Sequence, residues 1–170
     1  MVQYLDRPEA PLFVRILLAD DSPSMLQAAC RILEPEFQVV GTVDDGHAVL
    51  QATEQLHPDV VILDISMGTL SGLEAARLLT SVGTKAKIVF LTVHKDPEFV
   101  EEAFSAGAVG YVVKPRLGTD LLVAIREALI GHTFVSPDLS PRPSILDERG
   151  TPAYFWIPGR FLAIWASIRS

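Results

Sequence analysis

Acidic, hydroxyl and amine side chains stand at the ends of short apolar segments of this chain. Asp20 and Asp21 follow the first segment, Asp64 follows the third, Thr92 ends the fourth and Lys114 follows the fifth. Three carboxylates that come close together repel one another unless a cation binds to them. Mg²⁺ meets this requirement best, because it takes a few carboxylates and keeps water and phosphate oxygens as further ligands. These residue types therefore predict a magnesium site wherever the fold gathers them.

Phosphoryl transfer to a carboxylate is the chemistry that such a group supports. With a metal ion and Lys114 neutralising charge, one carboxylate can attack phosphorus and form an aspartyl phosphate. Positioning and charge neutralisation provide most of the acceleration in this reaction. Each residue alone has an ordinary explanation, since residues 20–23 can simply begin a helix and Asp64 can simply end a strand. The combination at successive strand ends is what favours a chemical site.

The apolar pattern predicts an α/β protein. Five segments rich in apolar and β-branched residues predict strands at residues 13–19, 37–43, 59–64, 86–92 and 109–113. Helical spacing predicts helices at residues 23–33, 47–56, 70–82, 96–106 and 119–130, with Ser22 and Thr119 as caps. In the last helix the residues expected to face inward are Leu121, Leu122, Ile125 and Leu129.

Strands that alternate with helices predict a parallel sheet with helices on both faces and right-handed connections. Strands one, three and four look buried, whereas strands two and five look weaker. This favours a doubly wound five-stranded sheet of the order 2-1-3-4-5, the flavodoxin-like (βα)5 class. All strand carboxyl ends then lie at one edge of the sheet, which is where the polar residues above would meet.

Composition limits the remaining possibilities. The chain has 170 residues, is 49% hydrophobic and carries a formal net charge of −7, which argues against binding nucleic acid by charge alone. Its single cysteine, Cys30, excludes an internal disulfide and suits a reducing cytoplasm. No apolar run reaches the roughly 20 residues of a membrane span. Residues 1–12 lack the apolar core of a secretory signal and are interpreted as a leader.

Four motifs resemble a known family. They are residues 17–21 (Leu-Leu-Ala-Asp-Asp), 64–67 (Asp-Ile-Ser-Met), 91–92 (Leu-Thr) and 111–115 (Tyr-Val-Val-Lys-Pro). In this order they resemble the receiver domain of bacterial two-component response regulators. The resemblance implies a domain over residues 13–131 that accepts a phosphoryl group from a sensor histidine kinase or phosphotransfer protein. It further implies a cytoplasmic switch that catalyses only its own phosphorylation and dephosphorylation, and is not an enzyme in the usual sense.

The same resemblance implies a role for each residue at the sheet edge. Asp64 would accept the phosphoryl group, and Lys114 would contact that group. Asp21 would bind Mg²⁺ directly, with Asp20 assisting through water. The backbone carbonyl of Ser66 would be the third protein ligand of the metal, besides Asp64.

Further residues are implicated in the response to phosphorylation. Thr92 would move to bond the phosphoryl oxygens, and Tyr111 would then turn inward and repack the face of helix four, strand five and helix five. A cis peptide bond is expected before Pro115. Gly68 stands where the family usually has proline, which predicts a more mobile loop and leaves the phosphoryl lifetime open. His94 is interpreted as a solvated loop histidine rather than a group that flanks the phosphoryl.

The end of the chain departs from the resemblance. Residues 131–139 resemble the linker of the subfamily that carries a C-terminal LuxR-type helix-turn-helix, but no such motif is visible after them. Residues 132–153 are predicted to be a linker, and residues 154–170 a short apolar tail that cannot bury a core of its own. The tail is expected to dock on the receiver or on a partner, to contact a membrane surface, or to be the remnant of a lost domain.

Three other questions stay open at this level. A Mg²⁺-dependent phosphatase or phosphotransferase would want a second acid two residues beyond a nucleophilic aspartate, whereas Asp20 and Asp21 are adjacent. A DNA-binding regulator would need more cationic residues than the four arginines of the segment after residue 140, so DNA binding through this chain alone is not expected. Homodimerisation through helices one and five, or through helix four and strand five, is compatible with the pattern.

Overall fold

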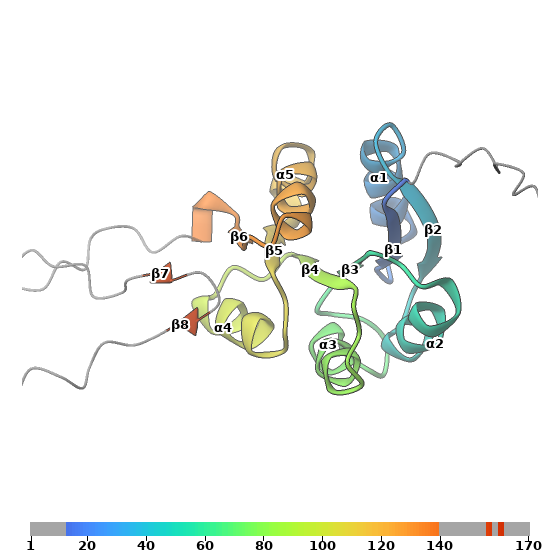
Figure 1. The fold of residues 1–170 in the computed structure, drawn as a ribbon. Helices are drawn as coiled ribbons and strands as arrows, with labels where there is room; N and C mark the ends of the chain where they lie inside the picture. The colour runs from blue at the N-terminus through green and yellow to red at the C-terminus, as the bar shows by residue number, and fades with distance from the viewer. Residues whose placement is uncertain (1–12, 140–155, 158–159, 162–170) are drawn as a thin grey trace, which may run out of the picture.

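A parallel six-stranded sheet lies between two layers of helices (Figure 1). The computed structural model describes residues 13–139 and the four residues of two short antiparallel strands, β7 (Trp156–Ile157) and β8 (Arg160–Phe161). The sheet order is β2-β1-β3-β4-β5-β6, and every neighbouring pair is parallel. The predicted doubly wound fold and the order 2-1-3-4-5 are confirmed, and a sixth strand extends the sheet beyond β5.

The observed elements lie within a few residues of the predicted ones. The strands of the large sheet are β1 (Arg15–Ala19), β2 (Gln38–Val43), β3 (Val60–Leu63), β4 (Lys87–Thr92), β5 (Gly110–Val113) and β6 (Phe134–Val135). The helices are α1 (Pro23–Leu33), α2 (Gly46–Leu56), α3 (Gly72–Ser81), α4 (Pro97–Ser105) and α5 (Leu117–Leu129), with 3-10 turns η1 (Lys114–Arg116) and η2 (Pro137–Leu139). None of the helices in the described part of the chain is long and apolar enough to cross a membrane.

Two apolar cores lie on opposite faces of the sheet. Successive side chains of a strand point to opposite faces, so Leu17 of β1 joins the core under α2, α3 and α4, whereas Ile16 and Leu18 join the core under α1 and α5. Figure 1 shows α1 and α5 on one side of the sheet and the other three helices on the opposite side. Because both faces are covered, the central strands are continuous apolar runs, and this is why they were recognisable in the sequence.

Local capping explains where two helices begin. The carboxylate of Asp45 accepts hydrogen bonds from two backbone N–H groups in the first turn of α2. At α3, Ser71 and Glu74 form a capping box, in which each side chain accepts from the other residue's backbone N–H. This box starts α3 at Gly72, so the predicted start at residue 70 is two residues too early.

Of the two predicted caps, Ser22 is confirmed in position and Thr119 is corrected by the structure. Ser22 occupies the cap position of α1, but its side chain makes no capping bond, and the helix begins on Pro23. Thr119 lies inside α5, because the turn η1 leads directly into the helix at Leu117. Leu129, which was expected to face inward, is 37% exposed because it lies in the last turn of α5.

Strand β6 places part of the predicted linker in the sheet. Phe134 pairs with Gly110 and Val135 pairs with Tyr111 at the edge of β5. The turn η2 follows, and its Leu139 packs against the core on the α4 side of the sheet. The predicted leader, the rest of the linker and most of the apolar tail lie outside the described residues.

Gly72 sits where the first turn of α3 meets the end of β3. Its N–H donates to the carbonyl oxygen of Ile65 at 2.9 Å. A side-chain carbon at this position would collide with the backbone carbonyl oxygen of Asp64. Only glycine therefore lets α3 approach the residue that follows β3 so closely.

We expect Gly72→Ala to lower the free energy of unfolding by about 3 kcal/mol or more, because backbone rather than a flexible side chain must move. Urea denaturation measures this loss. Gly118→Ala is the matched control, since nothing lies within 4 Å of a carbon added there and the residue is exposed on α5. That control should be neutral or more stable by up to about 1 kcal/mol. Equal stability of the two variants would contradict the contact at Gly72.

Candidate functional site

The carboxyl ends of the strands bring the predicted site residues to one edge of the sheet. Asp20 directly follows β1 and Asp64 directly follows β3. The backbone bonds of the sheet continue through both residues: the N–H of Asp20 donates to the carbonyl of Val43, and the N–H of Asp64 donates to the carbonyl of Ala19. The two acids are therefore held as firmly as strand residues, although they lie just beyond the strands.

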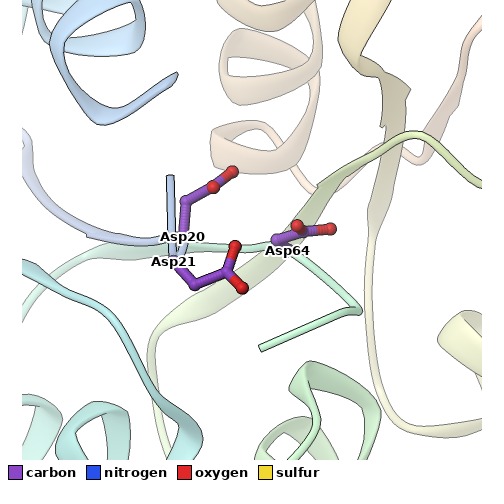
Figure 2. A group of neighbouring side chains, drawn as sticks. All are labelled: Asp20, Asp21 and Asp64. Atoms are coloured by element: carbon purple, nitrogen blue, oxygen red, sulfur yellow. The ribbon is translucent and has the colours of Figure 1, made fainter. Parts of the chain in front are cut away.

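Three carboxylates form a compact cluster at this edge. Ligand oxygens of Asp20, Asp21 and Asp64 all lie within 4.8 Å of one another. Figure 2 shows the three side chains side by side where the ends of β1 and β3 meet. Asp20 and Asp64 are 4% and 3% exposed, whereas Asp21 is open to solvent. The cluster thus has a buried floor and one solvent-facing acid, as a site reached from solution requires.

Lys114 supplies the cation of the cluster. Its Nζ lies 2.7 Å from Oδ2 of Asp20 and 2.8 Å from Oδ2 of Asp64, and its side chain is 11% exposed. Burial by itself lowers the pKa of Lys114, but the hydrogen bonds and charges of Asp20 and Asp64 outweigh burial and raise the pKa above its usual value. Lys114 is therefore an ammonium at neutral pH, and one positive charge faces the three acids.

The donor set fits a hard divalent cation. The other oxygen of Asp64, Oδ1, is buried and has no hydrogen-bond partner among the described residues. A buried, unpartnered carboxylate oxygen is costly unless a cation or a covalent partner engages it. With Lys114 already placed, the cluster still carries an excess of negative charge, which oxygen-preferring Mg²⁺ would balance. The structure brings Asp20, Asp21 and Asp64 together as predicted, whereas the role of the Ser66 carbonyl stays a prediction.

Thr92 and His94 link the loops around the cluster. Thr92 ends β4 and is fully buried, and its Oγ1 accepts a hydrogen bond of 3.4 Å from the N–H of His94. The ring of His94 packs against Phe99 at 4.2 Å, and its Nε2 lies 2.8 Å from Oγ of Ser66. His94 is thus a loop residue as predicted, but it is half-buried rather than free in solvent, because its side chain ties the loop after β3 to the loop after β4.

Tyr111 already points inward. Its side chain is completely buried, its ring lies 6.3 Å from that of Phe90, and its hydroxyl donates to the carbonyl oxygen of His94 at 3.0 Å. The inward orientation that was expected only after phosphorylation is thus the one that this structure adopts. The hydroxyl of Thr92 and the phenol of Tyr111 hold the same residue, His94, through its N–H and its carbonyl.

Two expectations about the loops are refined. The peptide bond before Pro115 is trans, as are all peptide bonds in the described residues, so the expected cis bond is wrong. The trans form is the lower-energy one for a bond before proline, and here residues 114–116 form a turn that leads into α5. Gly68 has a φ of +34°, and a side-chain carbon there would lie 3.0 Å from Cβ of Asp45. Proline, whose ring fixes φ near −65°, does not fit that backbone.

Sequence reasoning missed a polar group beside Lys114. Its centre is the buried carboxylate of Asp120, which accepts hydrogen bonds from the buried Ser136 and from the partly exposed Arg116. The only early signal was an acid, Asp120, on the side of α5 that also carries core residues. Ser136 gave no signal, because it lay in the predicted linker.

Comparison with known proteins agrees with this geometry. Residues 16–126 match the family model of the response regulator receiver domain. The transcriptional regulatory protein YxjL of Bacillus subtilis is 38% identical over 123 residues, which are 71% of this chain and 56% of that protein. The response regulator GacA of Pseudomonas aeruginosa is 33% identical over 129 residues, 75% of this chain and 60% of that protein. The chain thus spans less than two thirds of the length of these curated relatives.

Solved structures show the same likeness. A two-component response regulator of the LuxR family from Aurantimonas superposes with a TM-score of 0.71 at 33% identity, covering 74% of this chain and 91% of that one. The signal receiver domain of NarL from Mycobacterium tuberculosis gives a TM-score of 0.69 at 29% identity, covering 72% of this chain and all of that one.

We expect the phenol of Tyr111 to stay protonated where free tyrosine ionises. Burial raises its pKa above the usual value, and the charges of Asp96 and Asp64 add to this effect. The neutral phenol is favoured in the folded state, so its contribution to stability is present below about pH 10 and is lost above it, as the unfolded chain ionises first.

The measurement is an absorbance titration of tyrosinate in the native protein and in Tyr111→Phe. Between about pH 9 and 11 the two curves should coincide, because Tyr111 does not ionise there. Loss of one ionising tyrosine from the variant's curve in that range would contradict the buried, bonded phenol.

Proposed function

Because the chain belongs to the response regulator receiver domain family, we propose that it is a phosphorylation-controlled switch whose phosphoacceptor is Asp64. The observation that carries the proposal is the environment of this carboxylate. One oxygen is paired with the Lys114 ammonium at 2.8 Å, and the other is buried without a hydrogen-bond partner among the described residues. A nucleophile is thus held beside a fixed cation, with one oxygen left to react or to bind a metal.

The proposed reaction forms one bond to phosphorus and breaks another. An oxygen of Asp64 bonds to phosphorus while the bond from phosphorus to the donor breaks, and the electron pair of that bond leaves with the donor. The donor is the phosphohistidine of a sensor kinase or phosphotransfer protein, or a small acyl phosphate. Lys114 stands where negative charge develops and needs no rearrangement to stabilise it.

Mg²⁺ is the proposed cofactor, and Asp21, Asp64 and the backbone carbonyl of Ser66 would bind it, with Asp20 assisting through water. When bound, the ion neutralises the carboxylates and the phosphoryl oxygens in the way typical of phosphoryl-transfer sites. Support comes from the ligand oxygens of the three acids, which lie within 4.8 Å of one another. Asp21 is the solvent-facing member and therefore the one that a hydrated ion meets first.

The proposed switch runs through Thr92. When its hydroxyl moves to donate to a phosphoryl oxygen, Oγ1 is drawn away from the N–H of His94, and that N–H loses its acceptor. His94 also holds the phenol of Tyr111 through its carbonyl, so the loop between β4 and α4 and the buried ring would respond together. The output is a changed contact surface around α4, β5 and α5, for a protein partner or a second copy of the chain.

The function proposed for this chain does not include DNA binding. Relatives such as YxjL are named as transcriptional regulatory proteins, and the chain spans 56% of that protein's length. With a formal net charge of −7, the chain as it stands favours protein contacts as its output. We propose residues 13–139 as the receiver, with the apolar segment 154–170 as a contact for the receiver or a partner.

Incubation with acetyl phosphate and Mg²⁺ should add one hydroxylamine-labile phosphoryl group, seen by intact mass. Asp64→Asn should abolish the adduct because the nucleophilic oxygen is replaced. Asp44→Asn is the matched control, since Asp44 is an exposed acid that is not a member of the cluster. A stable adduct in Asp64→Asn, or an adduct that forms equally well without Mg²⁺, would contradict the proposal.

Mg²⁺ alone should raise the thermal unfolding midpoint of the protein, because it binds the folded cluster and not the unfolded chain. At a concentration a hundred times the dissociation constant the gain is about 2.7 kcal/mol. Asp21→Asn should weaken Mg²⁺ binding and remove most of this gain, whereas Asp44→Asn should keep it. Equal stabilisation of both variants would place the metal elsewhere, whatever the phosphorylation assay shows.

A further inference from the structure

Ser136 is completely buried, although it lies ten residues beyond the part of the chain that matches the receiver family. Its backbone N–H donates to the carbonyl oxygen of Tyr111 at 2.9 Å, as the next residue of strand β6 would. Its hydroxyl accepts a hydrogen bond of 3.2 Å from the N–H of Val113 and donates one of 2.7 Å to Oδ2 of Asp120. The side chain of Ser136 thus continues the bonding of the sheet where the strand itself stops.

Asp120 is the centre of the group that receives this bond. It lies on α5, is 4% exposed, and has both oxygens engaged. Arg116 donates from Nε to Oδ2 at 2.6 Å and from Nη2 to Oδ1 at 3.0 Å, and the hydroxyl of Thr119 donates to Oδ1 at 2.8 Å. Burial raises the pKa of Asp120, but the bonds from Arg116, Ser136 and Thr119 outweigh burial and lower it, so the group is a carboxylate at neutral pH.

Hydrogen bonds from this group hold the chain on both sides of Lys114. Val113, which precedes Lys114, is held through its N–H by the hydroxyl of Ser136. Arg116, two residues after Lys114, is held by Asp120. Both sides of the short segment that carries the ammonium are therefore linked to the buried carboxylate of Asp120, directly by Arg116 and through the hydroxyl of Ser136 on the side of Val113.

We propose that Ser136 is a positioning residue for Lys114, so that the segment after α5 completes the phosphoryl-transfer site instead of merely leaving the domain. The inference rests on the proposed function, because it concerns the cation of that site. The physical reason is reach: Lys114 belongs to the end of β5 but must place Nζ within 2.8 Å of carboxylates that follow β1 and β3. An error of about 1 Å in such a group can cost a hundredfold in rate.

Without the hydroxyl of Ser136, the N–H of Val113 has lost its bonded acceptor and Asp120 has lost one of its donors. The backbone before Lys114 can then move, and with it the ammonium. We expect Ser136→Ala to slow phosphorylation by acetyl phosphate on the order of tenfold, and hydrogen exchange of the Val113 amide to become faster. Affinity for Mg²⁺ should not fall, since none of the proposed ligands contacts Ser136 and a displaced ammonium competes less for the carboxylates of Asp20 and Asp64.

The experiment combines the rate, the Mg²⁺ affinity and the side-chain NMR signal of Lys114, one of four lysines in the chain. Ser136→Thr keeps the hydroxyl and should restore rate and signal. Ser81→Ala is the matched control, because that hydroxyl only caps the carbonyl of Leu78 on the exposed end of α3. Asp120→Asn keeps the volume of the central side chain and should slow the reaction as well, with the two losses not additive in the double variant.

Each outcome decides one claim. Wild-type rate and an unshifted Lys114 signal in Ser136→Ala would overturn the positioning role. A parallel loss of rate and Mg²⁺ affinity would also overturn it, because it would reveal general damage to the fold. If the wild-type protein itself gains no phosphoryl group, the proposed function fails, while the Lys114 signal, which needs no phosphoryl donor, still decides whether Ser136 places the ammonium.

Discussion

The Lys114 ammonium, held between the carboxylates of Asp20 and Asp64, is the interaction on which the other features of the site depend. Removing one partner from a nearly buried ion pair leaves an uncompensated charge, so the fold must deliver all three groups together. In the sheet, β4 separates β3 from β5, so the lysine must reach across the end of β4. Thr92 ends β4, so its buried hydroxyl lies between the strand ends that are followed by Asp64 and Lys114.

The parts of this arrangement that the sequence predicted are those set by local signals. Buried parallel strands are continuous apolar runs, and each polar site residue immediately follows or ends one of them, so strand order and site membership could be inferred together. The start of α3 was misplaced by two residues because the capping box at Ser71 and Glu74 outweighs the apolar pattern before it. These errors moved the boundaries of helices and left the site residues in place.

The parts that the sequence did not predict depend on tertiary contacts between distant residues. The His94 ring meets Ser66 across 28 positions, and only the conformation of two loops brings them together. Strand β6 has two half-buried residues and no periodicity of its own, so its pairing with the edge of β5 has no signal in the sequence. Ser136 is an ordinary linker residue by composition, and its importance comes from bonds to residues 16 and 23 positions away.

Tyr111 lies on both routes by which the proposed phosphorylation of Asp64 would act, and it makes a separate hydrogen bond on each. Its phenol is bonded to His94, on the loop that Thr92 controls, whereas its backbone carbonyl is bonded to Ser136. A ring can leave its hydrogen bond by side-chain rotation without breaking the backbone bond of the same residue. Repacking of the face around α4 therefore needs no change in β6. A displacement of Lys114 would instead act on Ser136, which follows β6, through the N–H of Val113. The proposed phosphorylation of Asp64 would thus reach the α4 face through the hydroxyl of Thr92 and the end of the domain through the ammonium of Lys114.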